Sequence, residues 1–590
     1  MPEPVRLPAV VDPSPPAAPD DAVERTRSAL TRMGAPERLA AALVAALGPD
    51  ADTQLVADPW RLLALGSVTP RQADFCARAL LGEAATPDDP RRVRALVVHL
   101  LRRASREGHT AVEYGRMAGA LRGLGVRTVD AALQAAAEDE RILLVEELPE
   151  EGDDDLDGDL PELPDPERFL ALSPLGGAEG RLGAELVRLT ASEPIMDSAT
   201  ATETVQAAAG QLGRSPAPET VAALVTAALR GVTVLLGGPA TAGARAEALR
   251  YAAAIAAESR VGLALAAPSA SGAAALNRAL ADDGPRARTV AALLADSSPL
   301  EAGLVVVAEA TALDTEAFAA LAAACPAEAH LLLLADPAQL PSAGPGQVVA
   351  DLVASRVAAV AVLPDDPEPG PREALAARVG EGELPDGVDA PGHEVVLVPS
   401  ASPGEAAHRA LQLVTDSVPR TFGLDAAQIQ IVTAAPGGEA GSSALNAACK
   451  ARFNPGPGAV RGLDPGDRVL LAGRGPGYAP GDTGVLRGHG EQGAAVELDD
   501  GTAVTVAHPA HLRPGWAIPL AAALGGAWPA AVAVFTADSA LSRPALRTAL
   551  TRGERHVSVV NAAGPALAAA VRDVPAVPRR TRLVRLLREG

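Results

Sequence analysis

Residues 232–245 read Val-Thr-Val-Leu-Leu-Gly-Gly-Pro-Ala-Thr-Ala-Gly-Ala-Arg, a short apolar run that leads into a glycine-rich turn and an alanine-rich segment. The apolar run predicts a buried strand, and the alanine-rich segment predicts a helix. A strand, a glycine turn and a helix N-terminus in this order point backbone N–H groups and the positive end of the helix toward an anion. The stretch therefore predicts an α/β fold in which this strand leads to a phosphate-binding turn.

The turn lacks the charged residue that nucleotide binding normally needs. In the P-loop pattern G-x-x-x-x-G-K-[ST], the lysine holds phosphate oxygens and the hydroxyl holds Mg²⁺. The register that begins at Gly237 ends in Ala-Gly-Ala at 242–244, and the register that begins at Gly238 ends in Gly-Ala-Arg at 243–245. No neighbour can supply a lysine, because the only one in the chain is Lys450. The sequence predicts the scaffold of a nucleotide site without its chemistry.

Length and composition predict a soluble, multidomain protein. A chain of 590 residues is too long for one core, and about 100–200 residues per domain gives three to five domains. The residues are 48% hydrophobic and only 2% aromatic, so alanine, leucine and valine must form the cores. The widely spaced Cys76, Cys325 and Cys449 predict neither a disulfide framework nor a zinc site, and no metal site is expected from ligand spacing. We expect a cytoplasmic protein without a signal peptide or membrane span.

The segments before the glycine turn differ in composition. Residues 1–20 are rich in proline and predict a disordered tail, and residues 148–166 form an acidic run that predicts a linker. Residues 21–147 show helical periodicity, with a strand expected at 142–145, and residues 167–230 again predict helices. Within the first helical region, helices are expected at 22–47, 71–82, 90–106, 112–122 and 127–139.

Four segments of the first helical region resemble RecD-like DNA helicases of superfamily 1B, the family of the exodeoxyribonuclease V alpha chain. They match the helix-hairpin-helix and winged-helix-like region before the motor, and they are 58–63 (Asp-Pro-Trp-Arg-Leu-Leu), 72–74 (Gln-Ala-Asp), 88–95 and 107–110. The family's Gly-Ile-Gly-type hairpin, whose N–H groups meet DNA phosphate, reads Gly-Ser-Val-Thr-Pro here at 66–70. The second glycine is lost and the proline has no N–H, so duplex contact and a purely structural domain both remain open.

The resemblance continues into a DNA-binding motif of the motor. Residues 261–274 are similar to the Ala-Pro-Thr-Gly-Arg-Ala-Ala motif that holds single-stranded DNA in the first motor domain. Pro268 and Ser269 are kept, whereas Ser271 stands at the arginine position. The net charge of −22 argues against DNA binding over a broad surface, so any DNA contact must be local and weak. The DNA-binding residues implied by the resemblance and by local charge are Pro268, Ser269, Arg91, Arg92 and Arg94.

Two further motifs of the family concern nucleotide chemistry. Residues 304–311 resemble a Walker B strand, in which Asp orients the Mg²⁺ shell and Glu positions the attacking water. Ala308 replaces that Asp, and Glu309 is kept. Residues 331–353 contain Asp-Pro-Ala-Gln-Leu-Pro-Ser-Ala-Gly-Pro-Gly, the segment that resembles the family most specifically. This motif couples nucleotide state to DNA in the family, and the resemblance implies that Gln339 reaches toward the γ-phosphate.

The second half of the chain also follows the family. Residues 429–433, 441–446 and 453–455 match, although the Arg or Lys expected just before Gly441 is absent. Residues 464–502 alternate apolar runs with Gly/Asp turns, which predicts a small β-barrel. His508 and His511 near its end are expected to be loop residues rather than metal ligands.

The last two motifs differ in what they keep. Residues 515–534 align with the Thr-Val-His-Lys-x-Gln-Gly-Ser-Glu motif, but only Gly525 remains of its functional positions. Residues 546–553 resemble Tyr-Thr-Ala-Leu-Thr-Arg-Ala, and Arg552 stands where the family has an arginine finger. The resemblance implies catalytic roles for Glu309, Gln339 and Arg552, with ATP and Mg²⁺ as cofactors. The cofactor-binding residues that it implies are Gly237, Gly238, Thr241, Gly243 and Asp336.

The resemblance implies an α/β protein with two RecA-like P-loop NTPase lobes, preceded by a helical helix-hairpin-helix and winged-helix-like region. We expect the strands at 232–236, 261–266, 304–308 and 331–335 to share one parallel sheet, because each apolar run is followed by a motif loop. The expected domains are the helical region at 21–147, a helical connector at 167–230, the first lobe at 231–360, the second lobe at 361–462 and 515–575, a β-barrel inserted in it at 463–514, and a C-terminal tail at 576–590.

Three hypotheses for function follow. The first is a helicase-derived pseudoenzyme that has lost ATP-driven unwinding and binds DNA, single-stranded or at a junction, or an unknown protein partner. The second is an active ATP-dependent 5′-to-3′ DNA helicase in DNA repair or recombination. The third is a structural interaction protein without a ligand. DNA-stimulated ATP turnover separates the second hypothesis from the other two.

Overall fold

The computed structural model describes residues 20–147, 166–281, 284–296 and 299–589, which form two compact units. The first unit contains the chain up to Glu107 together with Ala111–Gly176, and the second contains Gly108–Thr110 and the chain from Gly177 onward. The tail expected at 1–20 and the linker expected at 148–166 lie outside the described residues, except for Asp20 and Pro166.

The first unit is mainly helical, as its periodicity predicts. Its longest helix, α5 (Pro90–Arg106), begins after Asp89, whose side chain accepts a hydrogen bond from the Arg91 N–H. Val93, Leu96 and Val97 on one face of α5 lie in the core of the unit. The other helices are α1 (Asp20–Arg32), α2 (Ala40–Leu47), α3 (Ala51–Ala57), α4 (Pro70–Leu81), α6 (Tyr114–Gly123) and α7 (Val129–Ala137).

The start of the expected helical connector is a strand instead. Residues 167–172 form β3 (Glu167–Leu172), which lies between β1 (Val112–Glu113) and β2 (Ile142–Glu147) in an antiparallel sheet. Leu170 and Ala171 are fully buried, and pairing with two strands satisfies their backbone groups there. The connector then continues in α8 (Ser173–Thr190), α9 (Ser198–Gln211) and α10 (Pro218–Leu229).

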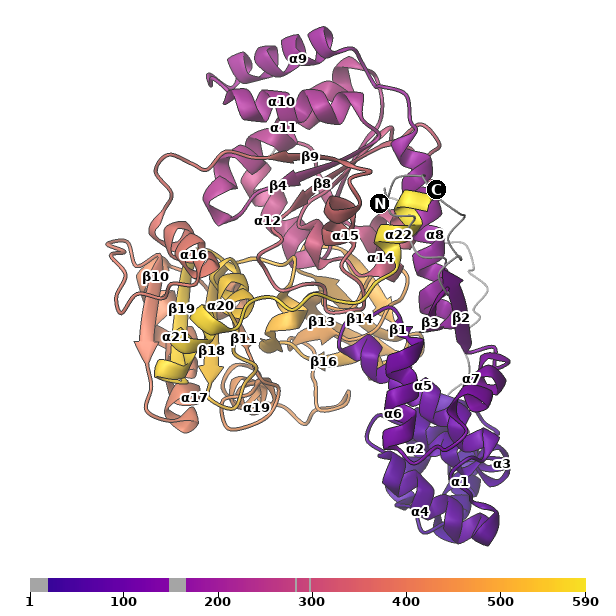
Figure 1. Ribbon diagram of the computed structural model, residues 1–590. Coiled ribbons are helices and arrows are strands. Elements are labelled where there is room, and N and C mark those ends of the chain that lie inside the picture. Colours follow the sequence, from indigo (N-terminus) through magenta and orange to yellow (C-terminus); the bar gives the residue numbers. More distant parts are fainter. Residues whose placement is uncertain (1–19, 148–165, 282–283, 297–298, 590) are drawn as a thin grey trace, which may run out of the picture. The chain divides into compact units, whose positions relative to one another are not determined.

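The first lobe of the second unit is built on a six-stranded parallel sheet (Figure 1). Its order is β6-β5-β7-β8-β4-β9, and the four predicted strands lie together in it, so this prediction is confirmed. The strands are β4 (Val232–Leu236), β5 (Leu263–Ala267), β6 (Ala287–Thr289), β7 (Leu304–Val307), β8 (His330–Ala335) and β9 (Ala359–Val362). The helices are α11 (Ala242–Glu258), α12 (Ala270–Leu280), α13 (Val290–Asp296), α14 (Thr315–Ala324) and α15 (Val348–Ser355).

The second lobe has its own parallel sheet, in the order β10-β19-β18-β11-β17. These strands are β10 (Val395–Pro399), β11 (Ile429–Thr433), β17 (Ala517–Pro519), β18 (Trp528–Thr536) and β19 (Gly553–Ala562). Its helices are α16 (Pro371–Glu381), α17 (Pro403–Gln412), α18 (Val418–Phe422), α19 (Ser442–Phe453), α20 (Arg543–Leu550) and α21 (Pro565–Asp573).

A small antiparallel β domain is inserted between β11 and β17, as predicted. Its five strands run in the order β15-β14-β13-β12-β16 and all contribute to one core cluster, so the sheet curves around its own interior. The strands are β12 (Arg468–Leu471), β13 (Thr483–Gly490), β14 (Gly493–Leu498), β15 (Ala503–Val506) and β16 (Leu512–Pro514).

The C-terminal residues return to the first lobe. The segment at 576–590, expected to be a tail, contains α22 (Leu583–Glu589), whose Leu583 and Leu587 are buried in the core of the first lobe. Before it, the Arg579 guanidinium donates hydrogen bonds to the carbonyls of Ser342, Gly344 and Gly346. Residues 574–582 thus form a strap from α21 to the first lobe. Among the described residues, no helix is long and apolar enough to cross a bilayer.

Candidate functional site

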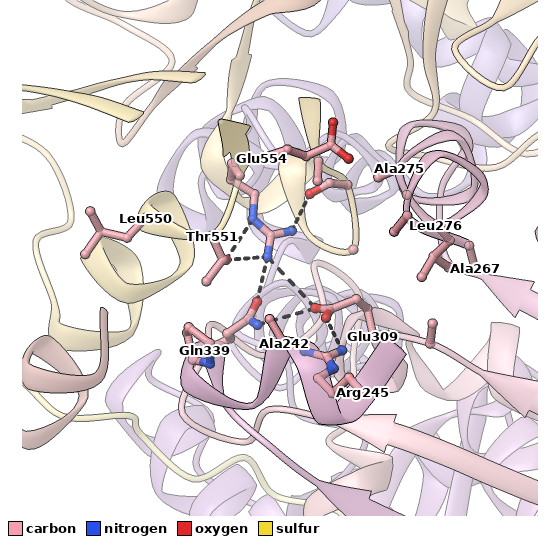
Figure 2. A pocket seen from close by; sticks show the side chains of 18 of the residues that line it. Ala242, Arg245, Ala267, Ala275, Leu276, Glu309, Gln339, Leu550, Thr551 and Glu554 are labelled. Carbon is pink, nitrogen blue, oxygen red and sulfur yellow. Dashed lines mark hydrogen bonds and ion pairs between the residues drawn. The ribbon is translucent and has the colours of Figure 1, made fainter. Parts of the chain in front are cut away.

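A pocket lies between the two lobes of the second unit, beside the glycine turn (Figure 2). Its volume is about 240 Å³, whereas sites for drug-sized ligands usually measure about 300–1,000 Å³. The lining residues include Gly238 and Arg245 from the glycine turn and the helix after it, and Glu309, which follows β7. They also include Gln339 of the segment 331–353, and Thr551 and Arg552, which follow α20. The pocket therefore occupies the nucleotide position of the fold but is small.

The glycine turn is closed by its own hydrogen bonds. The Gly237 N–H donates to the Ala335 carbonyl at 3.0 Å, which fixes the turn to β8. The buried Thr241 hydroxyl donates to the Gly238 carbonyl at 2.8 Å, so it points back into the turn. A Cβ on Gly237 would lie 2.4 Å from this hydroxyl oxygen, which explains the glycine. Thr241, a predicted cofactor-binding residue, stabilises the turn through this bond.

Glu309 follows β7 and is the centre of a polar network in the pocket. Its backbone is left-handed, with φ of 54°, an uncommon conformation for a residue with a side chain. Its carboxylate forms an ion pair with Arg245 and accepts a hydrogen bond from the Gln339 amide at 3.3 Å. Burial alone would raise the pKa of Glu309, but Arg245 and Arg552 outweigh it, so the pKa lies below its usual range. Glu309 is thus a paired carboxylate.

Arg552, at the arginine-finger position, is buried and saturated with protein acceptors. It donates to the carbonyls of Ala523, Gly526 and Thr548 at 2.7–3.0 Å, and to the Gln339 side-chain oxygen at 2.9 Å. Figure 2 shows that Glu309, Gln339 and Arg245 point toward one another in the pocket. The three predicted catalytic residues are therefore brought together, but they bind one another.

Asp336, a predicted cofactor-binding residue at the end of β8, is paired as well. Both of its carboxylate oxygens accept hydrogen bonds from Arg547 on α20, at 3.0 and 3.1 Å. Both residues are buried, and Arg547 also donates to the Ala376 carbonyl. Asp336 is therefore engaged within the chain through both of its carboxylate oxygens.

The charged side chains that line the pocket balance one another. The cations Arg245, Arg372 and Arg552 face the carboxylates Glu309, Glu373 and Glu554. A nucleoside triphosphate carries several negative charges, and sites that bind it normally offer a surplus of positive charge. This lining offers no such surplus.

The predicted DNA-binding residues of the first lobe are covered by protein groups. Ser269 is buried, and its hydroxyl accepts a hydrogen bond from the Gly272 N–H to cap α12. The N–H of Ala270, the first residue of α12, donates to the Asp482 carboxylate of the β domain at 2.8 Å. A Cβ on Gly525 would lie 2.8 Å from Pro268, so the turn at 525 packs against that residue. The N-terminus of α12 is occupied by the chain itself.

Two of the three predicted DNA-binding arginines of the first unit, Arg91 and Arg92, form contacts within the chain. Arg92 is buried and binds both oxygens of Asp74 at 2.7 and 2.8 Å. Burial would raise the pKa of Asp74, but the hydrogen bonds from Arg92 and Trp60 lower it below its usual value. Arg91 binds Asp89 and the Ala57 carbonyl, and the partly buried Arg94 lies on the same helix. An arginine that is held in such an ion pair does not contribute its charge to binding a DNA phosphate.

Four residues of this network escape prediction from the sequence. Asp366 and Asp482 are not positions of the motifs, Arg547 stands at the tyrosine position of the motif at 546–553, and Arg245 appears only as a mismatch in one register of the glycine turn. The arginine replacement at Arg245 was a usable signal, because a new cation beside a kept Glu309 predicts an ion pair. The other three depend on contacts between segments far apart in the chain.

The fold and the site together define a class. A glycine turn after the first strand of a parallel sheet, facing a second parallel sheet across a pocket, is the architecture of two-lobed P-loop NTPases. Two family models match the chain: residues 20–111 match the "ATP-dependent RecD2 DNA helicase HHH domain", and residues 197–364 match an "AAA domain". In these two regions the chain is similar to a RecD2 DNA helicase and to an AAA domain.

Solved structures of Pif1 helicases are similar at low identity. A Pif1 helicase from Bacteroides in complex with ADP-AlF3 and single-stranded DNA is 13% identical, with a TM-score of 0.33, over 55% of this chain and 88% of that chain. The Pif1 helicase from Candida albicans is 11% identical, with a TM-score of 0.32, over 56% of this chain and 90% of that chain. These values are too low to transfer an activity from those helicases.

Proposed function

We propose that this protein is a RecD-like helicase homologue that does not hydrolyse ATP and acts as a scaffold that binds DNA weakly or binds a protein partner. The observation that carries the proposal is the closed polar network around Glu309. Each group that the resemblance assigns to chemistry has a partner within the chain: Gln339 and Arg245 for Glu309, and Gln339 for Arg552.

The missing residues support the same proposal. No lysine follows the glycine turn, and Ala308 is buried where the family has the aspartate of the Mg²⁺ shell. Loss of one preorganised charge-stabilising group commonly lowers a rate by about 10²–10³. Such losses need not add, since catalytic groups act as a unit, but any one of them strongly slows the reaction.

ATP and Mg²⁺ are the cofactors that the family implies, and the residues present do not fit them. The Thr241 hydroxyl is directed to Gly238, and Asp336 is held by Arg547. The hydroxyl and the carboxylate that the resemblance assigns to the metal are thus both engaged within the chain. We therefore derive no hydrolytic step for this protein.

The test is ATP turnover by the purified full-length chain, with and without single-stranded DNA. We expect background turnover in both conditions, and no change in the Glu309→Gln variant. Glu301→Gln, at an exposed residue outside the pocket, is the matched control. Turnover that disappears in Glu309→Gln but persists in Glu301→Gln would refute the proposal and support an active helicase.

A further inference from the structure

A carboxylate of the chain sits on the N-terminus of the helix that follows the glycine turn. The Gly243 N–H, in the first turn of α11, donates to an oxygen of Asp366 at 3.1 Å. A Cβ on Gly243 would lie 2.7 Å from the other Asp366 oxygen, so the carboxylate fills the space directly above the turn. α11 has 17 residues, and a helix of this length favours an anion at its N-terminus.

The backbone holds Asp366 in this place from both sides. The Asp366 N–H donates to the Ala240 carbonyl within the turn at 2.6 Å. Three residues earlier, the buried Leu363 continues the pairing of β9 with β4 through a hydrogen bond from its N–H to the Leu236 carbonyl at 2.8 Å. Because β4 leads directly into the glycine turn, the segment 363–366 runs alongside the turn. The position of the carboxylate is therefore fixed by the sheet.

We propose that Asp366 determines the ligand specificity of this turn, by occupying the position of a nucleotide phosphate and excluding phosphate compounds from it. The inference rests on the proposed function and names the residue that enforces it. A carboxylate and a phosphate compete for the same N–H groups and the same helix end, and two anions placed there repel.

An arginine close to the turn is already paired with another carboxylate. Arg245 lies on the same first turn of α11, but its guanidinium is committed to Glu309. The arginines that line the pocket are already engaged, Arg372 with Glu373 and Arg552 with Gln339. A polyphosphate would have to displace the Asp366 carboxylate and would meet no unpaired arginine among the residues that line the pocket.

The chain contains a matched control one residue away. Asp365 is exposed, whereas Asp366 is partly buried against the turn. Asp365→Ala and Asp366→Ala remove the same charge at nearly the same place, so a general change in electrostatic potential affects both variants alike. Only Asp366→Ala frees the Gly243 N–H.

The experiment measures binding of inorganic pyrophosphate to the full-length chain by isothermal titration calorimetry. We expect Asp366→Ala to bind at least tenfold more tightly than the wild type, and Asp365→Ala to match the wild type. Equal affinity of Asp366→Ala and the wild type overturns the inference, as does an equal gain in both variants. If Asp366→Ala does not fold, Asp366→Asn replaces it, with a smaller gain expected because the side chain still fills the space; no gain in a folded Asp366→Asn overturns the inference.

ATP turnover measured on the same samples separates this inference from the proposed function. Turnover by the wild type refutes the proposed function whatever the binding results are. Tight binding of pyrophosphate by the wild type, without turnover, refutes the role of Asp366 and leaves the proposed function standing. Gain of binding without turnover in Asp366→Ala supports both.

Discussion

Arg547 on α20 of the second lobe binds both carboxylate oxygens of Asp336 at the end of β8 in the first lobe, at 3.0 and 3.1 Å. The pair is buried, with Asp336 only 2% exposed. Its geometry joins the two lobes by a planar, bidentate contact, which is the strongest form of ion pair in proteins. The segment 331–353 of the first lobe is thereby tied to α20 of the second lobe.

Removal of Arg547 should destabilise the protein strongly. Arg547→Ala leaves a buried carboxylate without its partner, and we expect a loss of about 3–5 kcal/mol in the free energy of unfolding. Arg572→Ala removes the arginine of an exposed pair with Asp573, and about 0–1 kcal/mol is expected there. Urea denaturation of both variants checks this, and similar midpoints for the two would contradict the role of the buried pair.

Arg92 should contribute to stability rather than to DNA affinity. Arg92→Ala breaks a bidentate pair with Asp74 and two hydrogen bonds to carbonyls, and we expect a loss of about 2–4 kcal/mol. Arg103→Ala, at an exposed arginine of the same helix, should change stability by less than about 1 kcal/mol. Denaturation midpoints and fluorescence anisotropy with a labelled oligonucleotide measure both properties. A folded Arg92→Ala protein with lower DNA affinity would instead support the predicted role of Arg92 in DNA binding.

The buried Asp482 should make stability depend on pH. Burial raises the pKa of Asp482 to about 7, while hydrogen bonds from the Ala479 and Ala270 N–H groups act in the opposite direction. The folded chain therefore holds this proton to a higher pH than the unfolded chain, so stability falls as pH rises from about 4 to about 7. The upper limit of this fall is about 4 kcal/mol.

Asp482→Asn removes the titrating group and should flatten this dependence. Urea midpoints at pH 5 and pH 8 measure it, and the difference between the two pH values should be smaller in the variant than in the wild type. Burial also raises the pKa of Asp351 to about 7, but that group is present in both proteins and cancels in the comparison. An unchanged difference in Asp482→Asn would show that Asp482 does not titrate in this range.

DNA binding should be weak and only mildly dependent on salt. Two of the three predicted DNA-binding arginines of the first unit, Arg91 and Arg92, are engaged with carboxylates, and the whole chain carries −22. For single-stranded DNA, log K falls with log salt by about 0.7 per neutralised phosphate, and we expect fewer than about three such contacts. Anisotropy across a salt series gives the slope. A steep slope with tight binding at physiological salt would contradict this prediction and support an active DNA helicase.

The fold was predictable because each strand of the first lobe carries its own signal. Apolar runs such as 232–236 and 304–308 are followed by motif loops, and a parallel sheet is the only common way to bury such runs on both faces. The strand β3 could not be predicted from local sequence, because residues 167–172 form a strand through pairing with β2. In the sequence, β2 lies on the other side of the acidic run. Local periodicity contains no information about such a partner.

The sequence indicates which residues meet in the pocket, but not which groups of the chain bind them there. Glu309, Gln339 and Arg552 do meet in one pocket, yet their motifs suggest groups that face a ligand. The motifs do not show which groups of the chain compete with a ligand: Asp366 is brought to the turn by the pairing of β9 with β4, and Arg547 reaches Asp336 only after the two lobes pack. A substitution such as Ala308 shows what is missing, whereas only the packed structure shows what takes its place.

The strap at 574–582 has a consequence for how the chain is made. The hydrogen bond between Arg579 and Gln347 joins positions 232 residues apart, and the core beneath it is completed by Leu583 and Leu587. On the ribosome, the second lobe and the β domain are synthesised before these leucines emerge. The core of the first lobe is therefore completed last. We expect both lobes to reach their final form in one late step rather than one after the other.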